Sequence, residues 1–197
     1  MTFLSGFSIG LSLILAIGAQ NAFVLKQGLL RKHVFLVCLI CALSDAILIT
    51  LGVMGFGEIV LAYPWIELFS KYAGAFFLIS YGLISLYSSA KNTHNLLPSK
   101  DSKDSISSTV ITCLAFTWLN PHVYLDTAVL LSSIALQSQA PIIFGLGAMS
   151  GSFLFFFSLG YGAKYLAPVF CNPASWRILD LVICAIMWAI ARKLLFF

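Results

Sequence analysis

Long hydrophobic runs alternate with short polar breaks along the whole chain. Six such runs occur, at residues 2–24, 34–57, 68–90, 109–131, 141–163 and 176–196. A helix needs roughly 20 mainly apolar residues to span about 30 Å of hydrocarbon, and each run meets that length. The pattern predicts an all-α integral membrane protein with six transmembrane helices.

The composition agrees with lipid as the main solvent. The chain has 197 residues, of which 60% are hydrophobic and 9% charged, whereas soluble domains carry about 25% charged residues. The basic residues lie between the apolar runs and form no stripe, so we expect no nucleic-acid partner. No basic residue precedes the first run, which is therefore expected to be a retained helix rather than a cleaved signal peptide.

The two halves of the chain resemble each other. Asn21-Ala-Phe-Val in the first half matches Asn120-Pro-His-Val in the second, 99 residues later. The only long hydrophilic stretch, residues 91–108, would link a first repeat (1–90) to a second (109–197). Three spans in each half require the second repeat to be inverted relative to the first, an arrangement typical of secondary transporters.

The distribution of Lys and Arg predicts the orientation in the membrane. The connections at 25–33, 91–108 and 164–177 carry three, three and two, eight in all, whereas the opposite side carries three. Because basic residues favour the cytoplasmic side, both termini are expected to be periplasmic.

Two carboxylates interrupt the apolar runs. Asp45 lies about midway along the second run, and Asp126 ends a stretch, 105–125, without Asp, Glu, Lys or Arg. An aspartate at the centre of a membrane helix costs about 2.5–3.5 kcal/mol on insertion scales, so it usually faces a partner or a polar cavity. Each is either a cation or proton site or a structural carboxylate bonded to a neighbouring helix.

Helix-breaking residues stand beside polar ones in two places. In "TWLNPHVYLD" (117–126), Pro121 removes an amide hydrogen bond, and unpaired backbone at membrane depth needs protein or a water-filled cavity. If the helix resumes regularly, His122 shares a face with Asp126 and would orient it or take part in transport.

The second such place is "IGAQNAF" (17–23), where Gly18 loosens the helix. The side chains of Gln20 and Asn21 would either serve the freed backbone groups or bind a ligand. The alignment of Asn21 with Asn120 favours one shared site. By contrast, the C-x-x-C pair Cys38 and Cys41 lies inside an apolar run without a second ligand pair, so we predict small buried residues and neither a metal nor another cofactor.

Several of these stretches resemble the bacterial lysine/arginine exporter (LysE) family, and most closely its arginine-exporter branch. They are "GAQNAFVLKQGL" (18–29), "ALSDAILITLGVMG" (42–55), "TWLNPHVYLDT" (117–127) and "VICAIMWAIA" (182–191). The chain departs from the closest arginine exporters at Ala19, where they have proline. The resemblance implies six hydrophobic segments in the inner membrane, export of arginine or lysine, and functional roles for Asp45 and Asp126.

The polar residues within the apolar runs are suited to a basic amino acid as substrate. A cationic side chain in a low-dielectric site needs fixed anions, and its α-carboxylate and α-ammonium need groups such as Gln20, Asn21 and Asn120. Exporting a cation from a negative interior requires energy, and no GxxxxGK[ST] loop for ATP is present, so exchange against protons is expected. The sequence is compatible with a homo-oligomer.

Two other functions fit the sequence less well. An exporter of neutral amino acids, or of a metal cation, would share the fold and family. A more distant alternative is an intramembrane aspartyl protease, which also needs two aspartates, but the settings "LSDA" and "YLDT" lack the GxGD pattern of presenilin-like enzymes. We therefore predict a transporter and not an enzyme.

Overall fold

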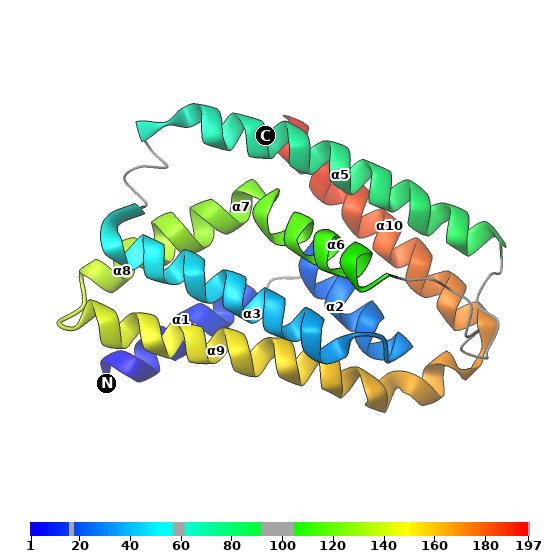
Figure 1. Cartoon of the computed structure of the whole chain (residues 1–197), viewed down its shortest axis with the longest axis horizontal. Coiled ribbons are helices and arrows are strands. Elements are labelled where there is room, and N and C mark those ends of the chain that lie inside the picture. The colour runs from blue at the N-terminus through cyan, green and yellow to red at the C-terminus, as the bar shows by residue number, and fades with distance from the viewer. Residues whose placement is uncertain (16–17, 57–61, 92–104, 197) are drawn as a thin grey trace.

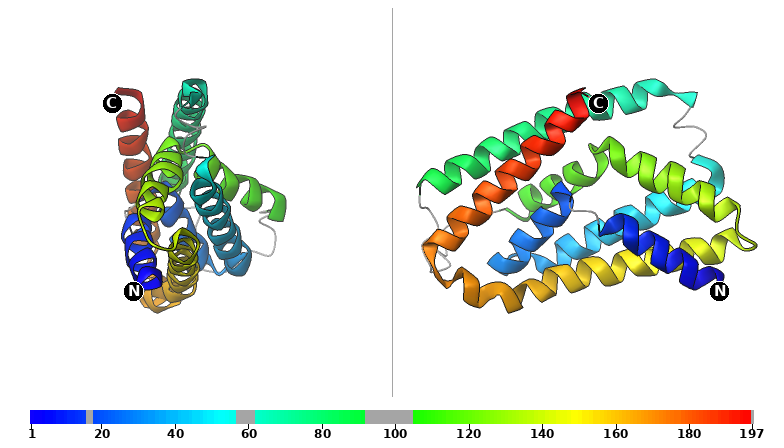
Figure 2. Two further views of the ribbon diagram at one scale, coloured as in Figure 1. Left: turned by 90° about the vertical axis from the view of Figure 1, so that its left-hand side faces the viewer. Right: turned by 180° about the vertical axis from the view of Figure 1, so that it is seen from behind.

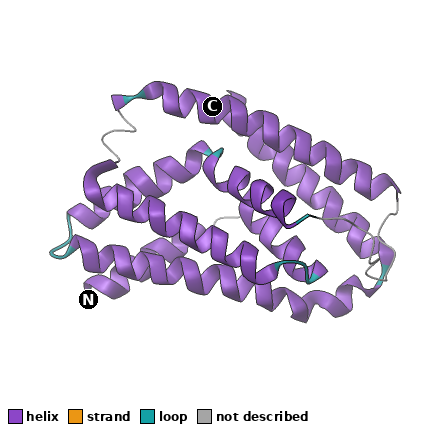
Figure 3. Ribbon diagram, viewed as in Figure 1, coloured by secondary structure: helices purple, strands orange, loops and turns teal. Residues whose placement is uncertain are grey.

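Every regular element that the computed structural model describes is a helix, as Figure 3 shows for residues 1–15, 18–56, 62–91 and 105–196. The prediction of an all-α protein is confirmed for these residues, whereas most of the predicted linker lies outside them. In chain order the elements are α1 (Thr2–Ile14), α2 (Ala19–Leu30), α3 (Val34–Leu51), the π-helix η1 (Gly52–Phe56), α5 (Pro64–Lys91), α6 (Ile106–Trp118), α7 (Pro121–Val123), the π-helix η2 (Tyr124–Leu131), α8 (Ser132–Leu136), α9 (Pro141–Gly162), the 3₁₀-helix η3 (Ala163–Cys171) and α10 (Pro173–Phe196).

Three of the helical segments are long and apolar enough to cross a membrane. They are Val34–Gly55, Leu68–Ala90 and Pro141–Phe170, and α1 with α2, bent by 84°, would make a fourth. The apolar stretches Ile106–Trp118 and Tyr124–Leu136 are each shorter than a full span. The membrane-protein class is therefore supported, and six spans stay a prediction.

Two pairs of long helices frame the molecule. Figures 1 and 2 show α5 beside α10 along one edge and α3 beside α9 along the other, with α2, α6 and α7 between the pairs. The α1 helix lies against α9, and this contact is among the most extensive in the fold. The two broken stretches, α1–α2 and α6–α8, are thereby held by neighbours that run past them.

Small residues let α1 and α9 approach to backbone contact. A side chain at Gly6 would meet the carbonyl oxygen of Phe144, and one at Gly147 would meet that of Phe3. Each glycine is followed four residues later by another, Gly10 and Gly151, which also face the opposite helix. Apolar side chains gain little by leaving lipid for a helix contact, so close packing of small residues is the main source of helix association in a membrane.

An aromatic cluster joins the broken helices to α5. The Phe116 ring of α6 lies 5.3 Å from Phe23 of α2, 4.8 Å from Phe77 of α5 and 4.9 Å from Tyr81 of α5, centroid to centroid. Aromatic pairs at such separations contribute roughly 0.5–1.5 kcal/mol beyond the area they bury. The cluster fixes the positions of α2 and α6 near their breaks.

The connection predicted at residues 25–33 is wrong in extent. The α2 helix continues through Leu30, and only Arg31–His33 separate it from α3, with Arg31 and His33 in the left-handed backbone region. Lys26 therefore lies in a helix, and its Nζ donates to Oδ1 of Asp180 at 2.7 Å. Asp180 is fully buried, so the charge that suggested a loop belongs to a buried ion pair between α2 and α10.

Candidate functional site

Both helix breaks open onto one cavity of about 270 Å³. Its volume approaches the lower end of the range for small-ligand pockets, about 300–1,000 Å³. Residues from α1, α2, α3, the α6–η2 stretch, α9 and α10 line it: Leu13, Ile14, Gly18, Ala19, Gln20, Asn21, Asp45, Asn120, Val123, Asp126, Thr127, Phe156, Ile190 and Lys193. Polar groups from both halves of the chain thus share one space.

At the first break, a side chain replaces a lost backbone hydrogen bond. The α1 helix ends at Ile14, α2 begins at Ala19, and Gly18 before it is extended (φ −123°, ψ 171°). Asn21 Nδ2 donates to the carbonyl oxygen of Ile14 at 2.9 Å. The Asn21 amide therefore serves a freed backbone group of α1, which is one of its two predicted roles. Asn21 also lines the cavity, where the second predicted role, ligand binding, would take place.

Gln20 is different. Its side chain lines the cavity and is only 8% exposed, and its Nε2 has no hydrogen-bond partner within the described part of the chain. Buried polar groups are satisfied in the great majority of cases. An acceptor supplied from the cavity would satisfy this donor.

The second break is packed from outside by α5. The α6 helix ends at Trp118, α7 begins at Pro121, and the Tyr124 hydroxyl donates to the carbonyl oxygen of Trp118 at 2.6 Å. Gly74 of α5 approaches the Leu119 carbonyl so closely that a β-carbon would collide with it. Asn120 is held between these contacts.

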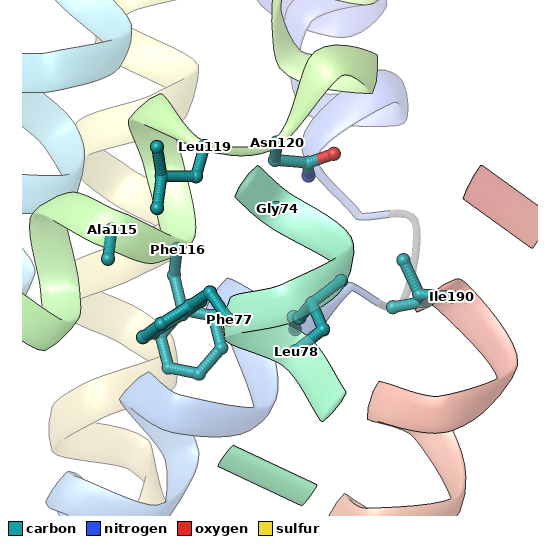
Figure 4. A pocket seen from close by; sticks show the side chains of 9 residues that line it. Gly74, Phe77, Leu78, Ala115, Phe116, Leu119, Asn120 and Ile190 are labelled. Atoms are coloured by element: carbon teal, nitrogen blue, oxygen red, sulfur yellow. The ribbon is translucent and has the colours of Figure 1, made fainter. Parts of the chain in front are cut away.

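Figure 4 shows Leu119 and Asn120 at this break, close to Gly74 and to the side chains of Phe77 and Phe116. The small apolar pocket drawn there holds only about 10 Å³, close to the minimum for a single water. It shares Asn120 with the larger cavity. The pocket in Figure 4 is thus a packing gap beside the cavity and too small for a metabolite.

The two predicted acids have different surroundings. Asp45 is 6% exposed, and its Oδ2 accepts a hydrogen bond from the hydroxyl of Ser152 on α9 at 2.8 Å. Asp126, near the start of η2, is exposed and faces the same cavity. One carboxylate is therefore fixed by a partner, and the other is accessible.

The relation predicted between His122 and Asp126 is conditional on a regular α-helix, and the structure has a π-helix there instead. The chain forms this π-helix from Tyr124, and a shared face for His122 and Asp126 stays a prediction. The side chain of His122 lies outside the described residues. Single-turn π-segments within helices often occur at functional sites.

The structure brings six of the predicted residues to the cavity and adds one that the sequence did not reveal. Gly18, Gln20, Asn21, Asp45, Asn120 and Asp126 line it, whereas Pro121 begins α7 without lining it. The additional charged residue is Lys193, one turn beyond Ile190 on α10. The available signal was a lysine within the last apolar run, 176–196, and this does not say which helix or cavity the lysine faces.

Within the described ranges, no three His, Cys, Asp or Glu side chains gather as metal ligands would. Cys38 and Cys41 are fully buried, as predicted for small core residues. The Cys38 thiol donates to the Phe156 carbonyl at 3.2 Å, and Cys41 lies 3.3 Å from Cys113, sulfur to sulfur. The chemistry that the cavity offers is recognition by two carboxylates, one ammonium group and amides.

Known proteins are similar to this chain over nearly its whole length. Residues 11–196 match the profile of the LysE type translocator family. The chain is 38% identical over 98% of its length to the arginine exporter protein ArgO of Salmonella typhimurium, and the match covers 92% of that protein. It is 41% identical over 92% of its length to a Mycobacterium tuberculosis protein provisionally named as an amino-acid transporter, of which 90% is covered. No solved structure matches.

Proposed function

The chain belongs to the LysE type translocator family, and we propose that it exports arginine, with lysine as a second substrate, across the bacterial inner membrane in exchange for protons. A translocator is a transporter and not an enzyme. The identity of 38% to an arginine exporter over 98% of the chain supports arginine as the first choice of substrate.

One observation carries the proposal. A single cavity of about 270 Å³ is lined by Asp45 and Asp126 together with the amides of Gln20, Asn21 and Asn120. A guanidinium or ammonium group needs fixed anions in a site of low dielectric, and the amides can bind the α-amino and α-carboxylate groups. This lining supports binding of the cation by both acids.

The other exporter functions have less support. A neutral amino acid carries no side-chain charge to balance the second carboxylate, and buried charge without a partner is costly. A metal cargo would favour several acidic or thiolate ligands together, and the described residues contain no such group. Asp45 is the acid that α3 holds together with the buried thiols of Cys38 and Cys41.

The substrate can be tested by flux from proteoliposomes loaded with labelled arginine. We expect arginine to leave, excess unlabelled arginine or lysine to compete, and threonine, homoserine or Cd²⁺ not to compete. Cells expressing the protein should also tolerate a toxic arginine analogue better than cells with an empty vector. Competition by threonine or homoserine and none by lysine would contradict the proposed substrate class.

Coupling to protons is a separate expectation. Moving one positive charge out of a negative interior costs about 2.3 kcal/mol per 100 mV, so uncoupled arginine would move inward at ordinary gradients. A carboxylate holds either a proton or a cation, so protons entering from outside would displace arginine from Asp45 and Asp126. At fixed membrane potential, an imposed pH gradient should drive arginine against its own gradient; flux that ignores the pH gradient would leave facilitated diffusion as the mechanism.

We also propose that the fold consists of two inverted three-helix repeats with both termini periplasmic. The parallel between the halves supports this: each half begins with a broken helix, α1–α2 or α6–α8, and continues with two longer helices. Asn21 and Asn120, which the sequence aligns, both line the cavity. Labelling of the two termini from opposite sides of the membrane would contradict an even number of spans.

A further inference from the structure

The cavity contains a basic residue that the proposed recognition of the cation leaves unexplained. Lys193 of α10 lines it together with Asp45 of α3 and Asp126 of η2. Within the described ranges, none of these three side chains forms an ion pair with another residue. The ion pair seen there joins Lys26 and Asp180. Three charged side chains thus share one cavity without neutralising one another through direct contact.

The charges of the cavity fit one class of ligand. Two carboxylates and one ammonium group leave one net negative charge. Arginine at neutral pH carries a guanidinium, an α-ammonium and an α-carboxylate, which leave one net positive charge. A neutral amino acid would leave a negative charge unbalanced, and a diamine without a carboxylate would place an additional positive charge near Lys193.

Gln20 provides an independent sign of an anionic or carbonyl group in the cavity. Its Nε2 is buried and makes no hydrogen bond of ordinary geometry among the described residues, where the sulfur of Cys41 is a nearby weak acceptor, yet the side chain borders the same space as Lys193. An amide N–H and an ammonium group are both donors, so neither can serve a guanidinium. Both can serve a carboxylate.

We propose that Lys193 and Gln20 bind the α-carboxylate of the substrate, while Asp45 and Asp126 bind its cationic groups. This inference rests on the proposed function and extends it: the protein selects an intact basic α-amino acid and rejects the corresponding decarboxylated amine. Lys193 is then a specificity-determining residue.

Agmatine, which is arginine without its α-carboxylate, separates this role from general attraction of cations. The first measurement is the thermal stabilisation of the purified protein by arginine and by agmatine. The second is how strongly unlabelled arginine and agmatine each inhibit the flux of labelled arginine. A hydrogen bond to a charged group corresponds to a preference of about 10-fold to 100-fold. The wild-type protein should therefore prefer arginine to agmatine by about that factor.

Lys193→Met keeps most of the length of the side chain and removes its ammonium group. We expect this variant to bind arginine about 10-fold to 100-fold more weakly and to lose its preference over agmatine. Gln20→Met should reduce the same preference by a smaller factor. Arg192→Met is the matched control, because Arg192 is the neighbour of Lys193 on α10, is exposed like Lys193, and does not line the cavity; it should keep the wild-type ratio.

The outcomes separate the two proposals. If arginine neither stabilises the wild-type protein nor is transported, the proposed function fails, and this inference fails with it. If the wild-type protein binds arginine but Lys193→Met keeps the wild-type preference over agmatine, whether or not overall affinity falls, Lys193 does not bind the carboxylate and the inference alone is overturned.

Discussion

Replacement of Asp45 or Asp126 by asparagine is expected to abolish arginine efflux while the protein remains inserted and folded. Asn has the shape of Asp and keeps an oxygen that can accept the hydrogen bond from Ser152, so the packing around Asp45 should persist. What it lacks is the negative charge that faces the substrate cation. At the buried Asp45, losing one partner of a desolvated charge pair costs about 2–5 kcal/mol, which corresponds to a decrease of about 30-fold or more in flux at low arginine, and at the exposed Asp126 we expect the lower end of this range.

Efflux of labelled arginine from preloaded cells, normalised to the amount of protein in the membrane, measures this effect. Two serines of α9 provide graded controls. Ser152→Ala removes the hydrogen bond to Asp45 but keeps its charge, so we expect a partial loss. Ser150→Ala removes an exposed hydroxyl that donates to the Leu146 carbonyl within its own helix, so wild-type efflux is expected. Full efflux by either Asn variant would remove that aspartate from the site.

The sequence could predict the polar residues of the site because each is unusual in its surroundings. An aspartate in an apolar run, or an Asn-Pro pair at membrane depth, signals an unsatisfied physical need without reference to the rest of the fold. Helix-breaking residues act locally as well, and the elements end or begin at Ile14, Ala19, Trp118 and Pro121.

Contacts between distant helices could not be predicted in this way. Ser152 lies 107 residues from Asp45, and its hydroxyl resembles the other serines of a Ser- and Gly-containing helix. Lys193 lies near the end of the last apolar run, and only the position of α10 brings it to the cavity. The spacing of apolar residues along the sequence predicts which face of a helix is buried, but not which other helix packs against that face. The π-helical stretch from Tyr124 to Leu131 likewise replaces the regular helix that the sequence suggested.

Lys26 illustrates a related error. A lysine after a hydrophobic run usually marks a connection on the cytoplasmic side, and here it lies within α2, paired with a buried aspartate 154 residues away. The ion pair allows the helix to continue past the charge. The pair of Lys26 and Asp180 holds the first half of the chain to the last helix.

This buried ion pair should contribute strongly to the stability of the folded protein. Removing one partner of a buried pair is typically destabilising by about 3–5 kcal/mol, because the other charge is left without compensation. Lys26→Met removes the ammonium group that lies 2.7 Å from the fully buried Asp180 carboxylate, so we expect the larger loss for this variant. Asp180→Asn should cost less, because the Lys26 side chain is 13% exposed and flexible enough to turn its ammonium group toward water.

The double variant Lys26→Met with Asp180→Asn is the decisive measurement. It leaves no uncompensated charge, and Asn keeps the shape of Asp180, so we expect it to regain most of the stability that Lys26→Met loses. Unfolding of the purified proteins in mixed micelles provides the free energies, and Lys164→Met, at an exposed lysine, is the control expected to match the wild type. Independent effects would add in the double variant, so a double variant as unstable as the sum of the single losses would show that the two charges do not stabilise each other. Recovery of stability in the double variant would mean instead that Lys26 stabilises the protein chiefly by compensating the buried charge of Asp180.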